Sequence, residues 1–511
     1  MKRKILLINP PLYRHPIWDP IRLSQPLGLW SIGTHLQKQG HDVKLLCAEM
    51  RGSDNIQLLD SSGHLLDNSF SQFHADKVAD FKTLDAQHFQ EKHAQYSKAY
   101  TRIGLGLDDI LAEVIAFAPD VIGISSCFTC NHQSVIELAQ FLKTRLPPEI
   151  WVVVGGQHAT AWPEVVFSQA ENSVDFVVCG EGEEVFGNLV ACYGDDAKAR
   201  QLPGIAWQHQ GAVTINPRPH FYQLNDYYDL EPDLMKGQGY DDAHHAYPTE
   251  GRMFTDMLFS VGCHRACSHC FSPVMRGKLR CLHEENIRLL LAKLKSGGYE
   301  ELILQDDDLI SDPNFELLLK LFKEYGFKWQ NNGGVELESL NESIVDIIIS
   351  SGCRSIYVPF NPRSLEDRIP TLPEQKKLDL IRKMYDAGIY VLTSGIYGVP
   401  DLSCPDHFFD DMDRLSDTHV RLVRERYFDV ALVFPLSILP MTQWWNKLEQ
   451  DAQKDFVFDK RAWLEYSIFA PQIHPRSVSK EKMEERLIAI HQKIDAVQVS
   501  KRWFSAFAAR G

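Results

Sequence analysis

Short apolar segments alternate with segments of helical spacing along most of this chain, and that alternation restricts the folds open to it. In residues 1–210 the expected strands are Lys4–Asn9, Val43–Cys47, Asp120–Ser125, Trp151–Val154 and Asp175–Val178. Strands that are apolar throughout are typical of a parallel sheet covered on both faces. The pattern therefore predicts an α/β, doubly wound (Rossmann-like) domain with its ligand at the carboxyl ends of the strands.

A second alternation spans residues 252–440 and contains about six strand–helix units, from Met257–Val261 to Val430–Phe434. It predicts a partial or complete (β/α) barrel of the TIM type, whose chemistry belongs at the carboxyl ends of the strands. Three segments differ from this pattern. Residues 50–100 are polar and predict an irregular insertion, residues 211–251 predict a linker, and residues 441–511 predict a mostly helical C-terminal region.

Charge and hydropathy exclude several classes of function. The chain has 53 Lys and Arg against 68 Asp and Glu, a net charge of −15, which argues against a broad nucleic-acid surface. It has no run of about 18 apolar residues, so no membrane span is expected. The apolar segment near Met1 is too short for a signal peptide. The sequence thus predicts a cytoplasmic protein that binds no nucleic acid.

Three of the eleven cysteines form one dense cluster, Cys263-x-x-x-Cys267-x-x-Cys270, directly after the first expected barrel strand. Three thiolates within eight residues converge only if the segment is a tight loop, which Gly262 permits. Soft thiolates select iron–sulfur clusters, zinc or copper(I). A four-iron cluster held by three cysteines leaves one iron open to a substrate or cofactor.

A structural zinc site is the alternative for this cluster, with His264 or His269 as the fourth ligand. Closed zinc sites usually take their ligands from two separated pairs. The chain's other C-x-x-C, Cys127/Cys130, lies in the first predicted domain. That pair is interpreted either as a redox pair or as two partly buried thiols.

The cysteine motif resembles the signature of the radical S-adenosylmethionine (SAM) enzymes, although His269 stands where that family usually has an aromatic residue. The resemblance implies a 4Fe-4S cluster on Cys263, Cys267 and Cys270, with SAM on the open iron. By position it assigns SAM contacts to Asp306, Asp307, Gly395 and Gly398. A solvated turn or a helix N-cap is the alternative for the three aspartates, and Asp308 and Asp312 are the residues to which it applies best. Residues 357–362 depart from the Glu-x-Gly that many relatives carry.

The first domain resembles the cobalamin-binding domains fused to radical enzymes, in Lys4–Pro11, Pro119–Ser125, Gly155–Thr160 and Cys179–Glu183. The cobalamin contacts that this resemblance implies are Ser126, Gly155, Gly156, His158, Gly180, Glu181 and Gly182. The motif Asp-x-His-x-x-Gly, which supplies a histidine ligand to cobalt in other cobalamin proteins, is absent. We therefore expect cobalamin without a protein histidine ligand, and interpret His132 and His158 as hydrogen-bonding histidines.

Together the two domains resemble the cobalamin-dependent radical SAM methyltransferases. The implied activity is methylation of an unactivated carbon of a small metabolite, lipid or peptide, through methylcobalamin and a 5′-deoxyadenosyl radical. An electron donor such as flavodoxin or ferredoxin is implied as well. A cobalamin-dependent radical cyclase or rearrangement enzyme is one alternative, and a cobalamin-binding sensor with a structural metal loop is another. The sequence identifies no general acid or base.

Overall fold

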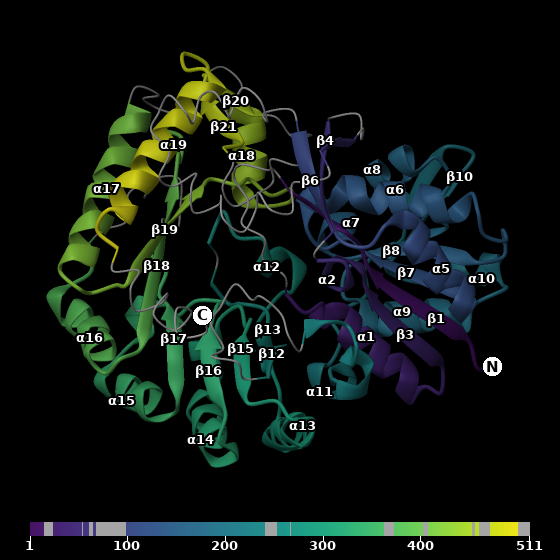
Figure 1. Ribbon diagram of the computed structural model, residues 1–511, viewed down its shortest axis with the longest axis horizontal. Helices are drawn as coiled ribbons and strands as arrows, with labels where there is room; N and C mark the ends of the chain where they lie inside the picture. The colour runs from purple at the N-terminus through teal and green to yellow at the C-terminus, as the bar shows by residue number, and fades with distance from the viewer. Residues whose placement is uncertain are drawn as a thin grey trace. The chain divides into compact units, whose positions relative to one another are not determined.

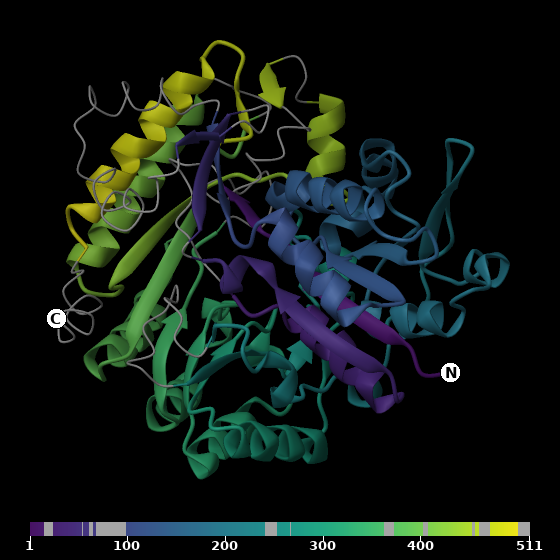
Figure 2. The same cartoon turned by 45° about the vertical axis from the view of Figure 1, so that its right-hand side comes forward.

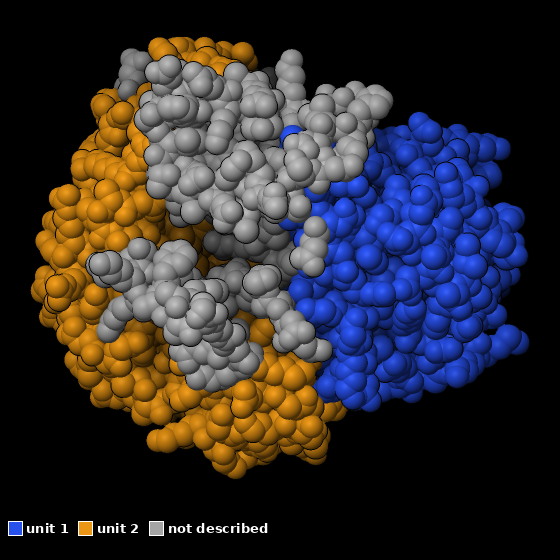
Figure 3. Space-filling view, in the orientation of Figure 1, with its two compact units in different colours: residues 1–77, 93–244 blue, residues 78–92, 245–511 orange. Residues whose placement is uncertain are grey.

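The computed structural model describes residues 1–14, 24–53, 55–60, 65–67, 99–240, 253–265, 267–361, 372–401, 407–451, 455–458 and 471–498. The chain forms two compact units, which Figure 3 draws in separate colours. Unit 1 comprises residues 1–77 and 93–244, and unit 2 comprises residues 78–92 and 245–511.

Unit 1 is built on a seven-stranded sheet of order β11-β10-β9-β8-β7-β1-β3. The five strands from β9 to β3 are parallel, and two antiparallel strands extend one edge. The strands are β1 (Lys4–Asn9), β3 (Asp42–Cys47), β7 (Val121–Ser125), β8 (Trp151–Gly155), β9 (Phe176–Val178), β10 (Ile205–His209) and β11 (Ala212–Ile215). The parallel strands confirm the five predicted from continuous apolar segments.

Helices cover both faces of this sheet (Figure 1). They are α1 (Leu27–Lys38), α5 (Leu107–Phe117), α6 (His132–Lys143), α8 (Pro163–Ala170) and α9 (Gly182–Ala191). Leu6 and Ile8 of β1 share a core with α5, α6 and α8, whereas Leu7 faces Gly33 of α1. Successive residues of a strand point to opposite faces, so the sheet is doubly wound as predicted.

The strand order reverses between β1 and β7, because the chain runs from β1 outward to β3 and then returns to the other side of β1. In an open α/β sheet such a reversal leaves a crevice at the carboxyl ends of the strands. Residues that directly follow β7 and β8 therefore lie at the edge where this fold binds ligands.

Two predictions about irregular segments of unit 1 need correction. Within residues 50–103, β4 (Ile56–Asp60), β5 (Leu65–Asp67) and β6 (Ala99–Ile103) join β2 (Leu12–Arg14) in a four-stranded sheet. The rest of the predicted insertion, residues 68–98, lies outside the described residues. The predicted linker contributes β11 and α11 (Leu224–Tyr227) to unit 1. These short strands form through backbone pairing, which leaves little side-chain periodicity to read.

Unit 2 contains a six-stranded parallel sheet whose order follows the sequence, β12-β15-β16-β17-β18-β19. The strands are β12 (Phe254–Met257), β15 (Glu301–Leu304), β16 (Lys328–Asn331), β17 (Cys353–Tyr357), β18 (Tyr390–Tyr397) and β19 (Val430–Pro435). The intervening helices are α13 (Glu284–Ser296), α14 (Phe315–Tyr325), α15 (Glu342–Ser350), α16 (Gln375–Asp386) and α17 (Phe408–Arg424). In the described strands β12 and β19 do not pair, so the sheet is a partial (β/α) barrel.

The first barrel strand ends earlier than predicted. Met257–Val261 is not one strand, because β12 stops at Met257 and the separate strand β13 (Ser260–Val261) pairs antiparallel with β14 (Arg280–Cys281). The three clustered cysteines lie between β13 and β14. The cysteine loop, residues 262–279, is thus closed by a two-stranded ladder at its base.

The C-terminal region of unit 2 contains α18 (Gln443–Asp451) and α19 (Lys480–Asp495), as a mostly helical region requires. It also contains a small sheet of β20 (Phe456–Phe458) and β21 (Ile473–Pro475). Helix α19 packs against α17 and β19, and Figure 2 shows the two helices side by side. Within the described residues no helix has the length and apolar character needed to cross a membrane.

Candidate functional site

The cysteine loop is folded tightly at both ends. Gly262 has a φ of +90°, and a Cβ there would lie 2.5 Å from the carbonyl oxygen of Lys278. The Cys263 N–H donates to the Gly277 carbonyl at 3.1 Å, and the Cys270 N–H donates to the Cys267 carbonyl at 3.1 Å. Only glycine fits at the start of this loop, and the loop brings its cysteines toward one another.

The three thiols are half-buried and free of disulfides. Burial, together with the charges of Asp308 and Cys270, raises the pKa of Cys263 to about 12. Burial also raises the pKa of Cys270, with a contribution from Cys267. These thiols favour their protonated form until a cation replaces the protons, which is how thiolate–metal sites load.

Three adjacent soft donors in one closed loop fit an iron–sulfur cluster. No three His, Cys, Asp or Glu side chains of the described residues form a group that would hold a single metal ion. The ligand set Cys263, Cys267 and Cys270 therefore stays a prediction, supported by the loop geometry and the donor chemistry.

The three aspartates after β15 hold the cysteine loop and the strand that leads into it. Asp306 Oδ1 accepts hydrogen bonds from the N–H groups of Phe259 and Ser260 at 2.9 and 2.6 Å, and from the Ser260 hydroxyl at 2.8 Å. Asp307 accepts from the Gly262 N–H at 2.9 Å. Asp308 accepts from the Arg265 side chain at 3.2 Å. The acidic run therefore fixes both the strand that enters the loop and the loop itself.

A solvated turn is the wrong interpretation for Asp306 and Asp308, which are 0% and 3% exposed. Burial raises the pKa of Asp306 to about 7, and its Oδ2 is buried without a hydrogen-bond partner. Asp306 Oδ1 binds Phe259 and Ser260, in the segment that leads into the cysteine loop. A contact of Asp306 or Asp307 with SAM stays a prediction.

The two glycines predicted to contact SAM both lie against helices. A Cβ on Gly395 of β18 would collide with the ring of His419 on α17. Gly398 has a φ of +78°, and a Cβ there would lie 2.9 Å from Met483 of α19. Helix packing thus requires glycine at residue 395, and the backbone conformation requires it at residue 398. Their contact with SAM rests on the resemblance alone.

Several residues near this site were not predicted from the sequence. Arg265 and Arg276 form ion pairs with Asp308 and Asp307, each at 3.2 Å. Asn331, at the carboxyl end of β16, is fully buried, and its side-chain nitrogen has no partner. A polar residue at a barrel strand end is the signal that would have pointed to Asn331. No local pattern reveals the arginines, because their partners are more than 30 residues away.

Four of the residues predicted to contact cobalamin meet at the carboxyl edge of β7 and β8. The Ser126 N–H donates to the Gly155 carbonyl at 2.6 Å, and the His158 N–H donates to the Ser126 carbonyl at 3.0 Å. Gly156 has a φ of +120°, and a Cβ there would lie 2.6 Å from the Ser126 carbonyl oxygen. The Ser126 hydroxyl is buried without a partner. An unpartnered hydroxyl at the ligand edge of this fold fits a polar ligand group.

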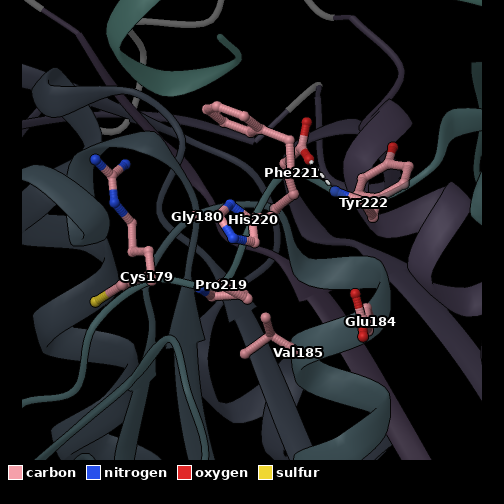
Figure 4. Close-up of a pocket in the computed structure, with 10 residues that line it drawn as sticks. Cys179, Gly180, Glu184, Val185, Pro219, His220, Phe221 and Tyr222 are labelled. Atoms are coloured by element: carbon pink, nitrogen blue, oxygen red, sulfur yellow. Dashed lines mark hydrogen bonds between the residues drawn. The ribbon is translucent and has the colours of Figure 1, made fainter.

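The other three, Gly180, Glu181 and Gly182, follow β9. Gly180 and Glu181 line a pocket of about 300 Å³, together with Cys179, Glu184, Val185, Arg218, Pro219, His220, Phe221 and Tyr222. The Tyr222 N–H donates to the carboxylate of Glu181 at 3.2 Å, the hydrogen bond that is drawn dashed in Figure 4. Gly182 does not line the pocket, and it faces Ile32 of α1.

The structure confirms that His132 and His158 are hydrogen-bonding histidines. Their rings are joined at 2.8 Å between His132 Nδ1 and His158 Nε2. His158 Nδ1 also contacts the Thr129 hydroxyl at 3.2 Å, and His132 Nε2 contacts Gln169 at 2.9 Å. Both ring nitrogens of each histidine are thus engaged within unit 1. Cobalamin binding without a histidine ligand to cobalt stays a prediction.

This histidine pair should make the stability of unit 1 depend on pH. Burial lowers the pKa of His158 from 6.5 to about 3, so the unfolded chain binds more protons than the folded one between these values. Stability is therefore complete above pH 6.5 and falls on acidification. Between pH 7 and 5, we expect wild type to lose about 2 kcal/mol through this group, a loss that His158→Gln avoids. Urea unfolding of both proteins at both pH values checks this. A difference in unfolding free energy between wild type and His158→Gln that is the same at pH 7 and pH 5 would contradict it.

Two family models match the chain. The B12 binding domain matches residues 86–190, which from residue 93 onward belong to unit 1, and the radical SAM superfamily matches residues 257–410, within unit 2. The first match contains Ser126 and the β7–β9 edge, and the second contains the cysteine loop and the three aspartates.

Individual relatives match longer stretches of the chain, and the first of them extends over both units. The chain is 26% identical over 444 residues to cytidylyl-2-hydroxyethylphosphonate methyltransferase from Streptomyces wedmorensis, which covers 78% of this chain and 73% of the relative. It is 28% identical over 275 residues to the anaerobic magnesium-protoporphyrin IX monomethyl ester cyclase from Synechocystis, covering 52% of this chain and 42% of that enzyme.

A solved structure with a similar fold is the radical SAM methyltransferase TsrM from Kitasatospora setae, with cobalamin and an iron–sulfur cluster bound. The match has a TM-score of 0.58 at 14% identity and covers 95% of this chain and 84% of TsrM. At this identity the similarity is one of fold. The chain thus has a B12-binding domain followed by a radical SAM domain, the combination of the cobalamin-dependent radical SAM enzymes that it resembles.

Proposed function

We propose that this protein is a cobalamin-dependent radical SAM methyltransferase that methylates an unactivated carbon of a small metabolite, lipid or peptide. The observation that carries the proposal is the cysteine loop, closed by β13 and β14 and held by Asp306, Asp307 and Asp308, in a chain that also has the B12-binding edge. The similarity to a phosphonate methyltransferase across both units supports methyl transfer.

In this proposal Cys263, Cys267 and Cys270 hold a 4Fe-4S cluster, and their number leaves one iron for SAM. The carboxylates of Asp306, Asp307 and Asp308 hold the loop in place, and Arg265 neutralises the charge of Asp308. When bound, the cluster with SAM supplies a hydrogen-abstracting radical, and cobalamin supplies a carrier for the methyl group.

In this proposal cobalamin binds at the carboxyl edge of β7 and β8, where the backbone can come close to the ligand and a side chain can donate a polar contact. Gly155 and Gly156 place backbone without side chains beside Ser126, whose buried hydroxyl is available to a ligand. Gly180 and Glu181 line the neighbouring pocket. The buried histidines below this edge hold Ser126 and the loop that follows it. A small redox protein such as flavodoxin or ferredoxin would supply electrons.

A cyclase or rearrangement reaction is the second candidate, because the chain also matches an anaerobic cyclase over about half its length. The cyclase match covers less of this chain than the methyltransferase match, which favours methyl transfer.

The test uses anaerobically purified protein, loaded with iron, sulfide and cobalamin, and SAM labelled in its methyl group. A methyltransferase forms both 5′-deoxyadenosine and S-adenosylhomocysteine, and the label enters the product. A cyclase forms 5′-deoxyadenosine without moving the label. Protein that takes up no iron and cleaves no SAM would exclude both radical reactions and leave the cobalamin sensor.

A further inference from the structure

Helix α18, beyond the match to the radical SAM family model, contacts the cysteine loop between two of the proposed cluster ligands. The N–H of Trp444, its second residue, donates to the carbonyl of Ser268 at 3.1 Å. The Trp444 ring packs against His269, with ring centroids 5.1 Å apart and an interplanar angle of 53°. Ser268 and His269 are the two residues that separate Cys267 from Cys270.

The contact between Trp444 and His269 is buried from solvent. Trp444 is 2% exposed, and the indole nitrogen and His269 Nδ1 are both buried. Thr442 fixes the start of the helix, since its hydroxyl accepts the N–H of Trp445 at 3.1 Å. The buried indole ring thus packs on His269 from a helix whose first turn is fixed by Thr442, while the Trp444 N–H bonds to Ser268.

We infer that Trp444 is a positioning residue for the iron–sulfur cluster: by packing on His269, it holds the segment between Cys267 and Cys270 so that both thiols face the same cluster. The inference rests on the proposed cluster ligation. It gives the C-terminal region a part in the radical SAM site. A buried aromatic ring suits the role, because it restrains a loop through a broad, rigid contact.

Trp445 supplies a matched control. It lies on the same helix, is 6% exposed, and packs against Phe458 of β20 at 5.2 Å between ring centroids. Trp444→Ala and Trp445→Ala therefore remove similar buried rings from adjacent residues, but the first ring packs on His269 of the cysteine loop and the second on Phe458 of β20. A general effect of weakening α18 would be the same in both variants.

The experiment loads wild type and both variants with iron and sulfide, then follows loss of the cluster to a chelator by visible absorbance. We expect Trp444→Ala to lose its cluster about 3- to 10-fold faster than wild type and Trp445→Ala to resemble wild type, as the strength of an aromatic pair implies. The electron paramagnetic resonance spectrum of the reduced cluster with SAM should change in the first variant alone.

Equal rates and spectra in the two variants would overturn the inference. If Trp444→Ala fails to fold, Trp444→Leu and Trp445→Leu give the same comparison with more apolar volume retained. Wild-type protein that takes up no cluster would instead overturn the proposed function.

Discussion

Replacing Cys267 with Ala is expected to abolish cleavage of SAM and to leave cobalamin binding intact. A three-cysteine site loses one iron ligand in this variant, and no other cysteine lies in the loop to replace it. We expect SAM cleavage to fall at least about 100-fold, since even partners outside the ligand shell of a metal site change activity by 10- to 100-fold. The measurements are iron and sulfide per chain and 5′-deoxyadenosine formed with a chemical reductant.

Cys281→Ala is the control for this experiment. Cys281 is also half-buried and lies on β14, at the base of the same loop, but outside the motif. The Cys281→Ala variant should retain the cluster, and this result would show that losing a thiol near the loop does not by itself remove the cluster. Cobalamin binding should be unchanged in both variants, because unit 1 has its own sheet and core. SAM cleavage that survives in Cys267→Ala would show that the motif does not hold the cluster.

The long elements could be predicted because each carries its signal within its own residues. Helical spacing predicts helices over Leu107–Phe117 and Glu342–Ser350, and a continuous apolar segment predicts a strand over Glu301–Leu304; the structure has all three elements with these bounds. Helical spacing marks the apolar face of each helix, and continuous burial marks the strand.

The first barrel strand was predicted wrongly because its break depends on a distant residue. Met257–Val261 reads as one apolar segment, yet the N–H groups of Phe259 and Ser260 bond to Asp306, more than 45 residues away. Those bonds withdraw Phe259 and Ser260 from the parallel sheet and leave Ser260 and Val261 to pair with β14. A local pattern cannot contain such information.

The same limit applies to the candidate site. The sequence identifies the three cysteines and the acidic run, because spacing and clustering are visible along the chain. It does not show that Asp306, Asp307 and Asp308 hold the cysteine loop, nor that Trp444 packs on His269. Those relations join residues far apart in the sequence, and they became visible only in the structure.

Replacing Asp306 with Ala should destabilise unit 2 and reduce its capacity to hold a cluster. The change leaves two backbone N–H groups and one hydroxyl buried without their acceptor. Each lost partner costs about 1–3 kcal/mol, so we expect the free energy of unfolding to fall by about 3 kcal/mol or more. Urea unfolding and the iron content after loading measure the two effects.

Asp306→Asn separates the holding role from contact with SAM. Asparagine keeps an oxygen acceptor for all three donors, and it resembles the protonated carboxyl that burial favours by raising the pKa to about 7. If Asp306 acts through the loop, Asn should lose less than about 1 kcal/mol of stability and load iron like wild type. If the residue instead binds SAM through an ionised carboxylate, Asn should load iron normally but bind SAM more weakly. Equal destabilisation by Ala and Asn would contradict the loop-holding role, because only Ala removes the acceptor.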